Sequence, residues 1–113
     1  GLAFTKKGIA IDSRDSTLRG QLDGPYLVKW DDSKLHVFAT TYSGVYEFVF
    51  DGTKFGSGTL AHTLKSTQPA PAGGPAQDVA PPGDPTLAKI NGVWYMYYGG
   101  GMSEKGIHYA TLQ

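Results

Sequence analysis

The sequence predicts an all-β fold of short antiparallel strands, because three features of its 113 residues agree. Short apolar and β-branched runs alternate with turn signals that hold many of the 16 glycines and 7 prolines. No stretch shows the 3.6-residue apolar period of a useful helix. The pattern of strands also occurs twice, at an offset close to 60 residues. Together these features predict one supersecondary unit that is used twice within a single domain.

The first unit reads as a succession of short strands separated by turns. An apolar run ends at Asp31-Asp32-Ser33, and the β-branched and aromatic run after it ends at Tyr42-Ser43-Gly44. A third run ends at Asp51-Gly52, and one more strand follows it. The strands predicted for this part of the chain are 26–30, 35–41, 45–50 and one near 55–63.

The second unit has the same plan, with strands predicted at 86–90, 93–99 and 107–112. Asn91-Gly92 is the strongest hairpin signal in the chain, because both residues tolerate a positive φ. Strand 93–99 is apolar on both faces, which predicts that it is covered on both sides. In each unit a proline is expected to open the first strand, where its missing N–H is tolerated.

Like residues mark the repeat and set its phase. The matched pairs are Pro25 and Pro85, Lys29 and Lys89, Leu35 and Trp94, and Gly44 and Gly106. Gly1–Phe4 also resembles Gly52–Phe55, which divides the domain, residues 1–113, into repeat units of about 1–51 and 52–113. Because residues 52–55 lead into the last strand of a four-stranded unit, the match predicts that the N-terminal residues also supply the last strand of a unit. The second unit lacks such a strand of its own.

Short antiparallel meanders that repeat in this way are typical of the blades of a β-propeller. The sequence therefore predicts an all-β propeller portion of two antiparallel four-stranded blades. Two blades cannot close a ring, so we expect completion by another chain or by copies of the chain itself. Three copies would form a six-bladed ring. The expected partner is a homo-oligomer or the rest of a longer propeller chain.

Composition excludes several classes of function. The formal net charge is zero and no basic run is present, which argues against nucleic acid as a partner. No apolar stretch approaches the ~18 residues of a membrane span, so we expect no membrane partner. There are no cysteines, and the three histidines lack metal-ligand spacing, so we expect no metal and no cofactor. We expect a secreted or periplasmic location.

Three segments carry a resemblance to a known family: 84–99, which begins Asp84-Pro85, the segment Asp23-Gly24-Pro25, and 106–111. They resemble blade motifs of the glycoside hydrolases of family 43 and their relatives, the arabinanase, xylosidase, invertase and levansucrase group. The resemblance implies a five-bladed propeller with three carboxylates around its axis. It implies that Asp84 is the Asp-Pro carboxylate and that Asp23 is the acid. Asp23 departs from the family, which usually has Glu at this position.

Glycoside cleavage uses one protonated and one ionised carboxyl group, and Asp84 and Asp23 are the catalytic candidates. Each also has a purely structural interpretation, because an aspartate beside Pro or Gly organises a turn through its own backbone. Arginine and amphipathic rings can bind sugars, although solvated loops and blade packing also explain such residues. The substrate-binding candidates are Arg19, Tyr26, Trp30, His36 and Tyr97.

Three functions follow from this pattern. The first is a glycoside hydrolase-like propeller that processes carbohydrate with paired carboxylates. The alternative is a non-enzymatic, oligomeric carbohydrate-binding lectin with two-blade subunits, whose affinity would come from multivalency. The third is a structural interaction propeller without activity. The sequence predicts carbohydrate as the ligand and leaves enzymatic activity open.

Overall fold

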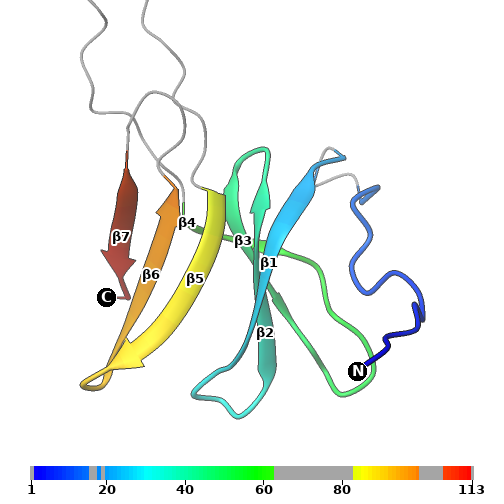
Figure 1. Cartoon of the computed structure of the whole chain (residues 1–113), viewed down its shortest axis with the longest axis horizontal. Helices are drawn as coiled ribbons and strands as arrows, with labels where there is room; N and C mark the ends of the chain where they lie inside the picture. Colours follow the sequence, from blue (N-terminus) through cyan, green and yellow to red (C-terminus); the bar gives the residue numbers. More distant parts are fainter. Residues whose placement is uncertain (1, 16–17, 19, 63–82, 100–105, 113) are drawn as a thin grey trace, which may run out of the picture.

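The computed structural model describes residues 2–15, 18, 20–62, 83–99 and 106–112. These residues form an all-β structure of two antiparallel sheets, and the described part of the chain contains no helix (Figure 1). The sheets lie beside each other, with β5 of the second sheet against the first sheet. The predicted all-β class and the two antiparallel units are therefore confirmed.

The first sheet is a four-stranded meander in the order β1-β2-β3-β4. Its strands are β1 (Leu22–Lys29), β2 (Leu35–Thr41), β3 (Gly44–Val49) and β4 (Thr59–His62). The central strand β2 is buried from His36 to Thr41, since neighbouring strands and packed layers cover it. The strands of this sheet span residues 22–62.

The second sheet is a meander in the order β5-β6-β7, formed by three strands among the described residues. Its strands are β5 (Gly83–Ile90), β6 (Val93–Gly99) and β7 (Ile107–Thr111). Asn91 and Gly92 both have a positive φ, 49° and 81°, in the turn between β5 and β6. The predicted Asn-Gly hairpin is confirmed, with the backbone that such a turn requires.

Two predictions about the strand edges are wrong. Residues 2–15 form no strand, and the N-terminus lies by the first sheet, far from β7 (Figure 1). The described N-terminal segment therefore does not supply a fourth strand to the second sheet. The prolines also do not open their strands, because β1 begins at Leu22 and β5 at Gly83. Each proline instead lies within a β-bulge, where the ladder is interrupted and a missing N–H is tolerated.

Strand register defines two faces of each sheet. Tyr26 pairs with Phe38 in the first sheet and Thr86 pairs with Tyr97 in the second, each just after the bulge. We name the face that holds Phe38 and Tyr97 face A. Because side chains alternate, Leu27 and Val37 in the first sheet, and Leu87 and Met96 in the second, belong to face B.

The core between the sheets joins face A of the first sheet to face B of the second. Phe38 and Val45 pack there against Leu87 and Trp94, all four buried. The indoles of Trp30 and Trp94 stack with a centroid distance of 4.3 Å. The opposite face of β6 is not buried in this core, since Tyr97 on it is 39% exposed. Within one copy the predicted cover on both sides of β6 is therefore not present.

A smaller core covers part of face B of the first sheet. Leu18 is buried there against Val37, Ala39 and Phe48, and Ile11 and Phe55 pack at its edge. A recess of about 260 Å³ remains beside it, lined by Ala10, Ile11, Leu22, Asp23, Pro25, Val37, Ala39 and Phe55. Ile11 and Leu18 thus pack on the first sheet, whereas Leu2, Phe4 and Ile9 are exposed.

Asp31 connects the two sheets at the end where β1 finishes. Its carboxylate accepts hydrogen bonds from Lys89 Nζ at 2.8 Å and from Trp94 Nε1 at 3.1 Å. The hydrogen bond from Lys89 is the main cause that lowers the pKa of Asp31, and the bond from Trp94 adds to it. Since the pair is exposed, its contribution is mainly to orient the two sheets.

Candidate functional site

Matched β-bulges lie near the beginning of β1 and of β5, and the two aspartates of the sequence prediction sit in them. In β1 the register shifts between Asp23 and Tyr26, and in β5 it shifts between Gly83 and Thr86. Both bulges hold one extra residue, and both contain the matched proline. Bulges of this kind re-aim side chains and occur often beside active sites.

Asp84 has a left-handed backbone in its bulge. Its φ is 52°, and Gly24, at the equivalent place in the first sheet, has a φ of 56°. Glycine adopts this conformation freely, whereas a side chain raises its energy, although aspartate tolerates it better than most residues. The second bulge therefore carries a carboxylate at a position where glycine would be the unstrained choice.

Thr40 of β2 joins the two bulges. Its hydroxyl accepts a hydrogen bond of 2.7 Å from the backbone N–H of Asp84, and its Cα pairs with Asp23 across the ladder. Thr40 is nearly buried, so this bond is shielded from water. Sequence reasoning missed Thr40, because a threonine within a β-branched run carries no signal that distinguishes it from strand packing.

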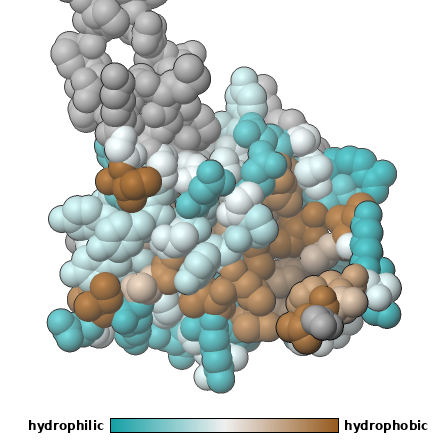
Figure 2. Space-filling model, in the orientation of Figure 1, coloured by the Kyte–Doolittle hydropathy of each residue, from teal (hydrophilic) through white to brown (hydrophobic). Residues whose placement is uncertain are grey.

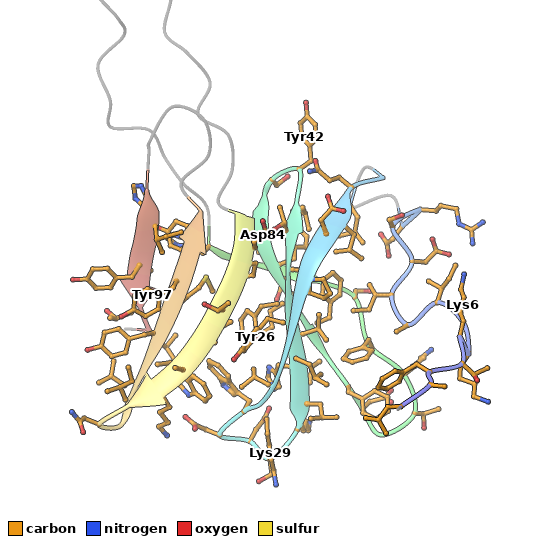
Figure 3. The ribbon with its side chains drawn as sticks, in the orientation of Figure 1. Lys6, Tyr26, Lys29, Tyr42, Asp84 and Tyr97 are labelled. Atoms are coloured by element: carbon orange, nitrogen blue, oxygen red, sulfur yellow. The ribbon has the colours of Figure 1, made fainter. Side chains whose placement is uncertain are left out.

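The Asp84 carboxylate lies against the backbone of Gly24. A Cβ added to Gly24 would collide with Asp84 Oδ1 and would lie 3.1 Å from Asp84 Cα. Asp84 is seen where β5 begins, next to the first sheet (Figure 3). The absence of a side chain at Gly24 is therefore what allows Asp84 to occupy its place between the two sheets.

Asp23 and Asp84 are both exposed, so the two carboxylates are open to solvent at this end of the sheets. We call the group of Asp23, Gly24, Thr40 and Asp84 the bulge site. Ionised carboxylates in such a place accept hydrogen bonds from hydroxyl groups of a ligand. The bulge site can bind a polyhydroxylated molecule by its edge.

Among the other predicted site residues, Tyr26 directly follows the bulge in β1, whereas Trp30 and Tyr97 lie farther from the bulge site. Tyr26 is half-buried between the sheets, and Tyr97 lies on face A of the second sheet, which points away from the first (Figure 3). Trp30 stacks on Trp94 near the opposite end of β1. Arg19 lies outside the described residues. Asp84 thus contacts Gly24, the chain neighbour of Asp23, whereas Trp30 and Tyr97 lie apart from the bulge site.

His36 is a packed histidine with both ring nitrogens engaged. Nε2 lies 2.9 Å from Asp32 Oδ2 and Nδ1 lies 3.1 Å from Glu47 Oε2. Its ring also stacks on Trp30 at 5.5 Å. The structural interpretation of His36, a buried and hydrogen-bonded strand residue, is the one that this geometry supports.

A cavity of about 240 Å³ opens between the sheets on the side of β4 and β7. Its lining is mostly apolar and includes the Trp30–Trp94 stack, with Glu47 and His62 as titratable groups. His62 Nε2 lies 3.0 Å from the Tyr98 hydroxyl. Burial lowers the pKa of His62, because an imidazolium loses hydration there.

The lowered pKa of His62 predicts a loss of stability on acidification. The unfolded chain binds a proton near pH 6.5, whereas folded His62 binds it only at lower pH, so acidification through this window favours unfolding. His62→Gln is expected to remove this part of the pH dependence. Urea unfolding at a series of pH values from neutral to pH 5 measures it. Parallel curves for the wild type and the variant would contradict the assignment.

No group of three or more His, Cys, Asp or Glu side chains is placed to hold a metal ion within the described ranges. The described part of the chain has no helix that could span a membrane.

Comparisons with protein-family models, with curated proteins and with solved structures find no match to the chain.

Proposed function

We propose that this chain is a β-propeller portion that binds carbohydrate at the bulge site. The observation that carries the proposal is Asp84, an exposed aspartate with a φ of 52° where the matched position of the first sheet is a glycine. Strained backbone at a non-glycine residue is concentrated at functional sites. The carboxylate of Asp84 contributes a charged acceptor to the ligand, and Asp23 contributes a second one.

The resemblance to the glycoside hydrolases of family 43 supports carbohydrate as the ligand class. In that family, motifs that resemble those around Asp23 and Asp84 deliver carboxylates to a central sugar site. The matched bulges here carry aspartates on β1 and β5, two first strands that lie side by side. Arabino-oligosaccharides, xylo-oligosaccharides and fructans are therefore the ligands to test first.

The binding test compares two substitutions of Asp84 that separate charge from backbone strain. Asp84→Asn keeps a residue that tolerates a positive φ, and Asp84→Gly removes the strain altogether. Both are expected to weaken binding of the best oligosaccharide at least ~10-fold, since a charged hydrogen bond contributes about 1.5–3 kcal/mol. Isothermal titration calorimetry measures the affinity.

Asp51→Asn is the matched control, because Asp51 is an exposed carboxylate whose bonds go to the Thr53 and Lys54 N–H groups of its own turn. This variant is expected to bind like the wild type. Binding by Asp84→Asn that equals the wild type would remove Asp84 from the site and contradict the proposal.

Glycoside hydrolysis is the second candidate function, and the pair of aspartates in neighbouring bulges favours it. Cleavage requires one carboxyl group as the acid and another as the base or nucleophile. If Asp23 and Asp84 fill these roles, Asp84→Asn abolishes the release of reducing sugar from the same oligosaccharides. Turnover that survives in Asp84→Asn would exclude Asp84 from catalysis, and a wild type without turnover would exclude the hydrolase. The binding function has its own test.

A further inference from the structure

In the contact between the two sheets, face A of the first sheet packs on face B of the second. The two equivalent faces, face A of the second sheet and face B of the first, carry exposed side chains. Phe38, on face A of the first sheet, is 3% exposed because face B of the second sheet covers it. Tyr97 occupies the same place on face A of the second sheet and is 39% exposed. On face B the pattern is reversed, since Leu87 is 6% exposed and its counterpart Leu27 is 58% exposed.

Face A of the second sheet forms an exposed aromatic and aliphatic surface. Tyr95, Tyr97 and Tyr109 stack there, with centroid distances between 5.8 and 6.4 Å. Tyrosine is enriched in protein interfaces because its ring is apolar and its hydroxyl remains hydrogen-bonded. Strand register places further exposed side chains around this stack: Ile90, Val93 and Ile107.

Face B of the first sheet offers the complementary surface. Leu27 and Leu35 are exposed on it, next to the recess of about 260 Å³. Apolar side chains gather on the surface over the first sheet and towards the N-terminal segment (Figure 2). A recessed apolar surface of this kind can accommodate aromatic rings from a second surface. The core between the two sheets accommodates the rings of Phe38 and Trp94 in this way.

We infer that face A of the second sheet binds face B of the first sheet in a second copy of this chain. The contact repeats between copies the packing that already joins the two sheets within one copy. It is head-to-tail, since each copy uses a different surface on each side. Asp23 of the bulge site lines the recess on face B, whereas neither surface contains Asp84.

Sedimentation velocity from micromolar to near-millimolar concentration tests the contact. The wild-type chain is expected to associate as its concentration rises. Tyr109→Lys, on face A, and Leu27→Lys, on face B, are each expected to raise the dissociation constant at least ~10-fold, because a charge must be desolvated in the contact. Both residues are exposed, so the variants are expected to fold, which circular dichroism verifies.

Mixing the two variants provides the decisive step. Each variant keeps the surface that the other has lost, so a mixture is expected to form a one-to-one heterodimer at concentrations where each alone is monomeric. Tyr42→Lys, an exposed aromatic in the turn between β2 and β3, is the control and should associate like the wild type. A wild-type monomer at every concentration, or a mixture that stays monomeric, would overturn the inference.

Discussion

Replacement of Gly24 by alanine is expected to lower the free energy of unfolding by about 3 kcal/mol. Two effects add in this variant. Gly24 has a φ of 56°, which alanine adopts only with strain, and a Cβ there collides with the Asp84 carboxylate. The measurement is urea unfolding followed by tryptophan fluorescence, which reports on the buried Trp30–Trp94 stack.

A double variant separates these two effects. Asp84→Gly removes the carboxylate but keeps the Cα that lies 3.1 Å from the added Cβ. Gly24→Ala in that background is therefore expected to lose less, about 2 kcal/mol, from backbone strain and this remaining contact. The difference between the two backgrounds measures the contact of Asp84 with Gly24. Equal losses in both backgrounds would show that the Asp84 carboxylate does not contact Gly24.

Replacement of Phe38 by alanine is expected to cause the largest loss of stability, about 3–5 kcal/mol. Phe38 is 3% exposed in the core between the sheets, so its removal leaves a cavity beside Leu87 and Trp94. Tyr97→Ala is the matched substitution, since Tyr97 has the same strand position in the second sheet. At low protein concentration it is expected to lose less than half as much.

Chemical unfolding of the dilute proteins compares these two variants. Equal losses of unfolding free energy in Phe38→Ala and Tyr97→Ala would contradict the account of the core, in which face A is buried in the first sheet and exposed in the second. The same comparison at high concentration connects to the head-to-tail contact. There the loss for Tyr97→Ala is expected to grow, because association stabilises the folded chain.

The strands and turns were predictable because the sequence marks them locally. β2, β6 and β7 coincide with apolar runs that turn residues separate from the neighbouring strands. The Asn91-Gly92 hairpin has the positive φ values that its two residues favour. The bulges could not be predicted in the same way. A proline inside a strand and a proline at its start give the same pattern, and only the register distinguishes them.

The candidate site was predictable in part. Two aspartates beside matched prolines indicated the beginning of β1 and of β5, but the pattern carries no information on the φ of Asp84 or on the partner of its backbone N–H. Thr40 therefore entered only from the structure. Trp30 and His36 were predicted to bind a ligand, but they pack in the protein instead. The sequence could not distinguish these roles, because aromatic and imidazole rings suit a ligand site and a packed core equally well.

Amide correlation spectra of isotopically labelled protein, titrated with the best-binding oligosaccharide, test the carbohydrate site most directly. The account predicts that the largest shifts occur at Gly24, Thr40 and Asp84, whose backbone groups surround the bulge site. It also predicts little change at Glu47, His62 and Thr111, which line the separate cavity between the sheets. Shifts confined to that cavity, or no shifts with any of the oligosaccharides, would contradict it.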